Sequence, residues 1–200
     1  MLGEPLTQGC AIRARPIGGK RRESIDAAPA AERRFAILSR MVRLLFVCMG
    51  NICRSPTAEG VMRRLLREQR LEDVVMVDSA GTGDWHAGSA PDERATAAAR
   101  ARGVTLAGAA RVVERHDFEQ FDLILAADRR NLRELRAAAP RGASARLHLL
   151  REFDPASDGA PDLDVPDPYY GGPDGFEHVL DLVERACRGL LEQLRADGRL

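Results

Sequence analysis

A cysteine, an arginine and a serine lie close together early in the chain, at Cys48, Arg54 and Ser55. They follow the apolar residues 44–47, which suit a strand that is covered on both faces. A helical pattern of apolar residues begins after Pro56. Because Ser55 is a good helix cap and Pro56 a good first helical residue, the stretch predicts a buried strand, a tight loop and a helix N-terminus.

This arrangement would bind an anion and activate a nucleophile. A loop that wraps ahead of a helix N-terminus points several backbone N–H groups at one spot, where a phosphate-like dianion fits. Arg54 adds a planar charged group that can grip two oxygens, and the same field favours a nucleophilic thiolate at Cys48. Gly50 and Asn51 can both take left-handed backbone angles. The alternative for Cys48 is a buried structural cysteine, but its position after a strand and before a helix favours a phosphate-binding loop.

Residues 47–59 closely resemble the signature of the low-molecular-weight protein tyrosine phosphatases. Residues 78–82 resemble the second-strand motif of that family, and residues 164–171 resemble a further family segment near the far end of the chain. The resemblance extends from about Val42 to the C-terminus. It implies a cysteine-dependent enzyme that hydrolyses phosphotyrosine in proteins.

The resemblance also implies a role for each matching residue. Cys48 attacks phosphorus, Arg54 holds phosphate oxygens, and Asp167 protonates the leaving phenolate and later activates water. A cysteinyl-phosphate is the intermediate, and no metal or other cofactor is required. The residues expected to form or support the phosphate-binding loop are Met49, Gly50, Asn51, Ile52, Cys53, Ser55 and Ser79.

Asp167 lies in an acidic, proline-rich loop that the sequence predicts over residues 154–173. Local sequence alone favours a simple turn aspartate, because the loop also contains Asp154, Asp158, Asp162 and Asp164. The family segment singles out Asp167, since two tyrosines follow it.

Trp85, Tyr169 and Tyr170 are all of the tryptophan and tyrosine in the chain, and all three lie in predicted loops. Loops at one end of a sheet carry function, so we expect these rings to form an apolar wall for an aromatic substrate. Ordinary packing of exposed rings is the alternative.

Three residues of this stretch, Asn51, Ser55 and Cys53, have further expected roles. In the family, the Asn51 side chain is held by a network that includes Ser79 and a histidine before an Ala-Arg pair, but this chain has Gly108 at the candidate histidine position. Ser55 can donate a hydrogen bond to the Cys48 thiolate in addition to capping the helix. Cys53 is either a small buried residue or, as the resemblance implies, a partner that traps oxidised Cys48 in a reversible disulfide.

Strand and helix patterns alternate along the chain. They predict an α/β fold of three layers (α/β/α) around a central four-stranded parallel sheet, with the site beyond the carboxyl ends of the strands. The expected helices cover residues 56–69, 92–102, 129–138 and 175–194, with a helical turn at 116–121. The expected strands after the first cover residues 74–78, 123–126 and 145–149.

The composition bounds the class of protein. Two hundred residues with 44% hydrophobic content suit one domain, and a net charge of zero gives no indication of nucleic-acid binding. No apolar run approaches the length of a membrane span, and the N-terminus lacks the apolar core of a signal peptide. The four scattered cysteines and the four isolated histidines suggest neither a disulfide framework nor a metal site. We therefore expect a cytoplasmic protein without membrane insertion.

Residues 1–40 differ from the rest, with an excess of basic residues and no sustained period. We expect an N-terminal extension there that is disordered or lies before the true start, and a phosphatase domain over residues 41–200. The predominance of arginine over lysine suggests a GC-rich bacterial source. The expected partner is a tyrosine-phosphorylated protein, for example a bacterial tyrosine kinase.

Three alternatives share parts of these features. Related bacterial enzymes act on phosphoarginine, but they typically carry threonine where this chain has Ile52. Arsenate reductases share the expected fold but need a further cysteine pair, and only Cys187 remains in the body of the chain. A non-catalytic phosphate-binding or redox-sensing module is the third, and the intact set of Cys48, Arg54 and Asp167 argues against it.

Overall fold

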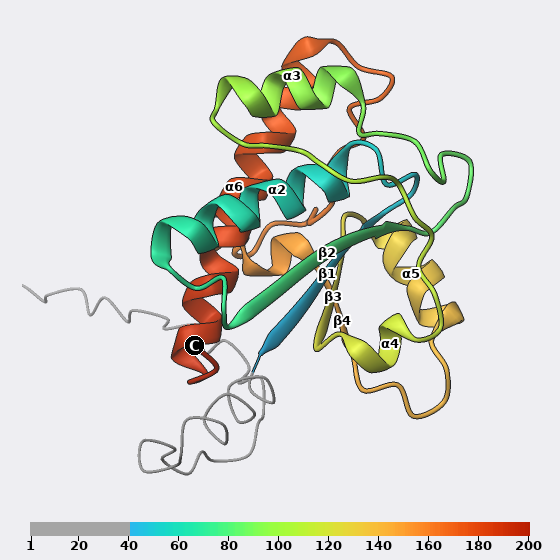
Figure 1. Ribbon diagram of the computed structural model, residues 1–200, viewed down its shortest axis with the longest axis vertical. Helices are drawn as coiled ribbons and strands as arrows, with labels where there is room; N and C mark the ends of the chain where they lie inside the picture. Colours follow the sequence, from blue (N-terminus) through green and yellow to red (C-terminus); the bar gives the residue numbers. More distant parts are fainter. Residues whose placement is uncertain (1–40) are drawn as a thin grey trace, which may run out of the picture.

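The computed structural model describes residues 41–200, which form a four-stranded sheet between two layers of helices (Figure 1). All strand pairs are parallel, and the strand order is β2-β1-β3-β4. The strands are β1 (Val42–Cys48), β2 (Val75–Gly81), β3 (Leu123–Ala126) and β4 (Arg146–Leu149). The expected three-layer α/β architecture is therefore confirmed. The expected extension over residues 1–40 lies outside the described residues.

The two helical layers differ in size. The larger layer has α2 and α6 against the sheet with α3 beyond them, and the smaller layer has α4 and α5 (Figure 1). The helices are α2 (Arg54–Gln69), α3 (Glu93–Ala101), α4 (Asp117–Gln120), α5 (Arg129–Ala138) and α6 (Pro173–Ala196), with 3-10 helices η1 (Leu150–Phe153) and η2 (Pro155–Ser157). Among these helices none combines the length and the apolar character that crossing a bilayer would need.

The central strand β1 is buried on both faces, as its apolar sequence predicts. Side chains alternate along a strand, so Leu44 and Phe46 enter the core under α2 and α6, whereas Leu45 and Val47 enter the core under α4 and α5. The strand thus joins the two cores and ends at Cys48, at the carboxyl edge of the sheet.

The element boundaries correct three expectations. α2 begins at Arg54 with Cys53 as its N-cap and no side-chain capping bond, so the prediction that Ser55 caps this helix is wrong. The second strand continues past residue 78 to Gly81, because β1 pairs with it along its full length and Val112 adds a further bridge to Gly81. The expected loop over 154–173 contains the short helix η2.

The long helix α6 packs closely on η1 at a glycine. A Cβ atom added to Gly189 would lie 1.9 Å from the carbonyl oxygen of Phe153. The helix can therefore approach this backbone only where it has no side chain.

We predict that Gly189→Ala destabilises the protein by about 1–3 kcal/mol, because the methyl group forces α6 away from η1. At an ordinary helical position the same change would stabilise by up to about 1 kcal/mol, so the sign is diagnostic. Denaturant unfolding measures it, with the exposed α6 position Glu192→Ala as the control. A more stable Gly189→Ala protein would contradict the close approach.

Candidate active site

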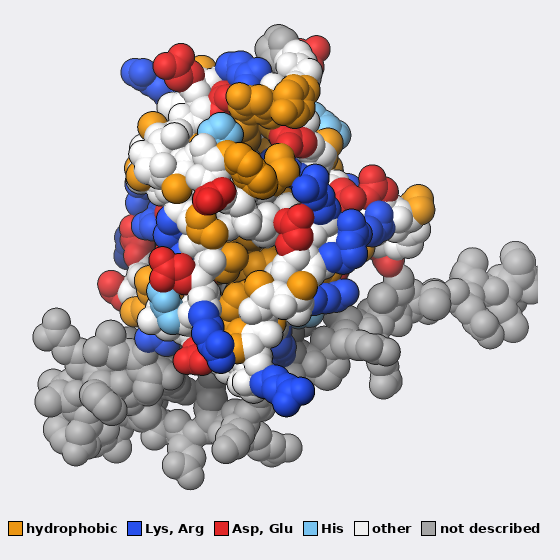
Figure 2. Space-filling view, turned by 90° about the vertical axis from the view of Figure 1, so that its right-hand side faces the viewer, with side chains coloured by type: hydrophobic (Ala, Val, Ile, Leu, Met, Phe, Trp, Pro, Cys, Tyr) orange, Lys and Arg blue, Asp and Glu red, His pale blue; other side chains and the backbone are white. Residues whose placement is uncertain are grey.

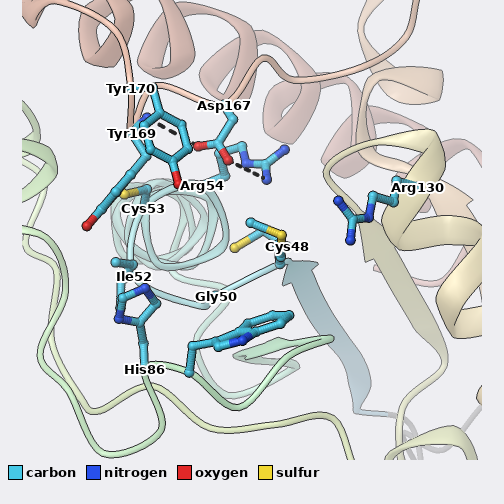
Figure 3. Close-up of a pocket in the computed structure, with 12 residues that line it drawn as sticks. Cys48, Gly50, Ile52, Cys53, Arg54, His86, Arg130, Asp167, Tyr169 and Tyr170 are labelled. Carbon is cyan, nitrogen blue, oxygen red and sulfur yellow. Dashed lines mark hydrogen bonds and ion pairs between the residues drawn. The ribbon is translucent and has the colours of Figure 1, made fainter.

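The loop between β1 and α2 forms the floor of a cavity of about 380 Å³ at the carboxyl edge of the sheet (Figure 3). Cys48 and Arg54, at the two ends of the loop, both line it. Loop residues Met49, Gly50, Ile52 and Cys53 also line it, as do the predicted residues Trp85, Asp167, Tyr169 and Tyr170. The structure therefore brings together chemistry-bearing residues from three distant parts of the chain.

The Cys48 sulfur lies in a polar environment although the residue is only 2% exposed. The backbone N–H of Asn51 donates to Cys48 Sγ at 3.3 Å, and Ser55 Oγ lies 3.1 Å from it. The single hydroxyl proton of Ser55 can turn either to this sulfur or to the carbonyl oxygen of Ala80 at 3.2 Å. Because a thiolate can only accept, it would draw that proton, so both contacts stabilise the charged sulfur.

Asn51 holds the loop in shape through its side chain. Its φ of 53° is left-handed, and its Nδ2 donates to Ser55 Oγ and to Ser79 Oγ, both at 2.9 Å. Its Oδ1 accepts from the backbone N–H of Arg111 at 2.9 Å. Ser79 Oγ in turn donates to Glu59 Oε2 at 2.6 Å. Every polar atom of the Asn51 amide group thus has a partner, and the network closes without the histidine that the chain lacks near Gly108.

Gly50 does not take the left-handed backbone conformation that the sequence allows it. It is absent from the left-handed glycines of the described residues, whereas Asn51 takes that conformation as predicted. A Cβ atom at Gly50 would lie 2.8 Å from the ring of His86. Gly50 therefore permits the close approach of His86 to the loop.

Arg54 is a buried cation, 5% exposed, with partners from two other segments. Its Nη1 donates to Asp128 Oδ2 at 2.6 Å and to the carbonyl oxygen of Val165 at 3.2 Å, and its Nη2 lies 3.4 Å from Asp167 Oδ2. Burial alone would lower the pKa of Arg54, but the negative charges of Cys48 and Asp167 and the bond to Asp128 raise it overall. The guanidinium is therefore a fixed charge at the cavity.

Asp167 lies at the cavity with its side chain 33% exposed, within reach of both Arg54 and solvent. Its Oδ1 accepts from the backbone N–H of Tyr169 at 3.2 Å, which orients the carboxyl group. The neighbouring candidates are engaged elsewhere, since Asp162 and Asp164 both contact Arg129. The structure thus favours Asp167 over its neighbours as the group that reaches a bound substrate.

Aromatic side chains form one wall of the cavity. Tyr169 and Tyr170 meet edge to face with ring centroids 5.0 Å apart, and the His86 ring lies 6.3 Å from that of Tyr169. Arg94 holds the wall from behind, since it donates to the carbonyl oxygen of Tyr169 at 3.0 Å and lies 5.2 Å from its ring. Trp85 is 69% exposed and Tyr170 is 88% exposed, as is typical of aromatic side chains that contact a ligand or another protein.

Sequence reasoning missed three residues of this site. The sequence places His86 only among four isolated histidines and does not single out Arg130 or Asp128. In the structure, His86 and Arg130 line the cavity and Asp128 anchors Arg54. Their position in the sequence could have indicated Asp128 and Arg130, because both closely follow β3, whose carboxyl end lies at the same edge of the sheet as Cys48.

The other cysteines of the described residues are neutral thiols. Burial, followed by the nearby charge of Asp92, raises the pKa of Cys53 to about 12. Cys187 lies on the face of α6 that enters the core, and burial raises its pKa as well. An arsenate reductase needs a further cysteine pair that can shuttle a disulfide. Cys187 is buried in the core and does not line the cavity, so it does not support that alternative.

We predict that removing the Asn51 side chain lowers both stability and turnover. Asn51→Ala should cost about 2–4 kcal/mol, from left-handed strain of about 1–2 kcal/mol and unpaired buried groups. Asn51→Gly relieves only the strain, so it should be about 1 kcal/mol more stable than Asn51→Ala while aryl phosphate hydrolysis falls equally in both. Equal stabilities, measured by denaturant unfolding, would show that the loop does not hold φ at 53°.

Iodoacetamide at neutral pH should alkylate Cys48 and leave Cys53 and Cys187 unmodified. A thiol with a pKa of about 12 is almost wholly protonated at pH 7, because its reactive thiolate fraction falls about tenfold for each unit by which the pH lies below the pKa. Peptide mapping by mass spectrometry identifies the site, and inorganic phosphate should protect Cys48. Comparable labelling of Cys53 at pH 7 would contradict the assignment.

Comparisons with known proteins agree with this geometry. The family described as "Low molecular weight phosphotyrosine protein phosphatase" matches residues 43–200. A low molecular weight protein-tyrosine-phosphatase of Streptomyces coelicolor is 49% identical over 160 residues, covering 78% of this chain and 97% of that protein. A low molecular weight phosphotyrosine protein phosphatase of Sus scrofa is 41% identical over 154 residues, covering 76% and 95%.

Solved structures of similar proteins have the same fold. The crystal structure of a protein tyrosine phosphatase from Entamoeba histolytica, with Hepes in its active site, is 38% identical and has a TM-score of 0.74. That match covers 80% of this chain and 99% of the other. With the family match and these relatives together, the chain belongs to the low molecular weight phosphotyrosine protein phosphatase family of enzymes.

Proposed function

We propose that Cys48, Arg54 and Asp167 are the catalytic residues with which this chain hydrolyses phosphotyrosine in proteins. The observation that carries the assignment is their convergence on one cavity, where Arg54 lies between the sulfur-bearing loop and the Asp167 carboxyl group. One group that attacks, one that holds charge and one that moves a proton are what cleavage of a phosphate ester needs.

The first step transfers the phosphoryl group to sulfur. The Cys48 thiolate forms the S–P bond while the bond between phosphorus and the phenolic oxygen breaks, and Asp167 gives its proton to that oxygen. The loop N–H groups and Arg54 hold the equatorial oxygens, where negative charge is spread in the transition state. The products are a free tyrosine side chain and a cysteinyl-phosphate.

The second step restores the enzyme. Asp167, now ionised, takes a proton from a water molecule as that water attacks phosphorus, and the S–P bond breaks. Inorganic phosphate leaves, and the Cys48 thiolate and protonated Asp167 return. Asn51 and Ser55 act as positioning residues here, because their hydrogen bonds stabilise the sulfur anion that departs.

The cavity walls support an aromatic substrate. Ile52, which is almost fully buried, and the rings of Trp85 and Tyr169 offer apolar surface beside the loop. One similar solved structure, at 31% identity, is that of a Drosophila arginine phosphatase, so phosphoarginine is the substrate against which to compare. A peptide with phosphotyrosine should be hydrolysed far faster than the same peptide with phosphoarginine.

The proposed partner is a tyrosine-phosphorylated protein, and a bacterial tyrosine kinase in the cytoplasm is the specific candidate. Bacterial relatives such as the Bacillus subtilis phosphatase YfkJ, 41% identical over 162 residues, support a bacterial setting. The free cysteines Cys48, Cys53 and Cys187 of the described residues suit a reducing compartment. Residues 41–200 are the proposed phosphatase domain.

We predict that Asp167→Ala slows phosphotyrosine hydrolysis by roughly 10²–10⁴-fold, the usual loss for a general acid. Esters of strongly acidic phenols should slow much less, since their leaving groups depart without a proton. Rates across a series of aryl phosphates measure this, with Asp162→Ala as the matched control and Cys48→Ser as the inactive reference. A plot of log rate against leaving-group pKa no steeper in Asp167→Ala than in the parent would remove Asp167 from the mechanism.

A further inference from the structure

Arg130 lines the catalytic cavity but has no role in the proposed chemistry. It lies on the opposite side of Cys48 from Tyr169 and Tyr170, with its guanidinium turned towards the cavity (Figure 3). Its side chain is 63% exposed, in contrast to the buried Arg54 that is proposed to hold the phosphate. Arg130 is therefore a charge at the mouth of the site rather than at its floor.

The backbone that carries Arg130 is fixed by the site itself. Asp128 accepts from the backbone N–H of Asn131 and so caps α5, while its other oxygen accepts from Arg54. The first turn of α5 is thereby tied to the phosphate-binding arginine. The only ion partner of Arg130 among residues 41–200 is Glu134, 3.0 Å away on the next turn of the solvent-facing side of α5. Such surface pairs contribute little to stability and exchange readily for another carboxylate.

The positive charge continues along α5 away from the cavity. Arg133 and Arg136 are exposed on the following turns, and neither has an ion pair within the described part of the chain. The face of the molecule that carries α5 shows basic side chains among acidic and apolar ones (Figure 2). We call Arg130, Arg133 and Arg136 the α5 edge.

The dimensions of the α5 edge match an extended peptide. The helix rises 1.5 Å per residue, so Arg130 and Arg136 are separated by about 9 Å along its axis. Three residues of an extended chain span about 10 Å. When the ring of a phosphotyrosine lies against Tyr169, one flank of its peptide can leave the cavity past Arg130, on the opposite side of Cys48, and follow the α5 edge (Figure 3).

We propose that the α5 edge selects phosphotyrosine sites flanked by aspartate or glutamate, with Arg130 as the specificity-determining residue nearest the cavity. The occupant is the acidic segment of the same protein substrate, recognised by charge complementarity. This inference rests on the proposed function, since it concerns the residues on either side of the hydrolysed phosphotyrosine.

The test compares two phosphotyrosine peptides that differ only in their flanks, Asp and Glu in one and Asn and Gln in the other. We expect the parent enzyme to favour the acidic peptide in kcat/KM by about 5–30-fold at low salt, mostly through KM. The preference should shrink as ionic strength rises from about 0.05 to 0.5 M. Arg130→Gln should reduce the ratio by about 2–5-fold, and the triple change of the α5 edge to Gln should abolish it.

The control removes the same charge elsewhere, with Arg67, Arg188 and Arg195 on α2 and α6 changed to Gln. These residues are exposed and do not line the cavity, so the peptide preference should persist. Equal kcat/KM for both peptides in the parent, or the same loss of preference in the control, would overturn the inference while leaving the phosphatase assignment intact. Failure of the parent to hydrolyse either peptide would instead overturn the proposed function.

Discussion

The buried charge of Arg54 constrains the site more than any other single feature. A guanidinium that is 5% exposed must have partners, because leaving one partner out of a buried ion pair costs about 3–5 kcal/mol. Its partners are Asp128, at the start of α5, and the segment that carries Val165 and Asp167. The end of β1, the end of β3 and the acidic loop must therefore meet at one edge of the sheet for the fold to tolerate this charge.

The loop itself depends on a second set of bonds, centred on Asn51. The left-handed backbone conformation of Asn51 has a lower conformational energy than it would have with most other residues. The amide group of Asn51 also joins the loop to β2 through a hydrogen bond to Ser79. The backbone N–H of Arg111 supplies the donor that Asn51 Oδ1 needs, while Glu59 accepts from Ser79. The absence of the family histidine thus leaves no polar atom of the Asn51 side chain unpaired. The rigidity of the loop rests on backbone geometry as much as on side-chain identity.

Much of this arrangement was predictable from local sequence, and the failures share one cause. The apolar run before Cys48 and the helical periods gave the layers and the parallel sheet, because burial imposes those patterns on the chain itself. Asp128 and His86 escaped prediction because their importance arises from contacts with residues distant in the sequence, which no local pattern records. Asp128 contacts Arg54, and His86 lies against Gly50 and Tyr169. Arg130 escaped because it reaches the cavity only through the pairing of β3 with β1. Ser55 was predicted in part: its contact with the Cys48 sulfur is present, but the residue lies inside the first turn of α2 and so does not cap the helix.

The central place of β1 in the sheet also bears on how the molecule folds. β1 pairs with β2 on one side and with β3 on the other, where Leu44 lies beside Leu123. The second pairing closes a long stretch of chain, and contacts of such sequence separation form late and slowly. Arg54 cannot acquire Asp128 until that closure occurs. A chain without that closure therefore lacks the anchor of Arg54, and an anion that binds the complete site favours the fully folded molecule.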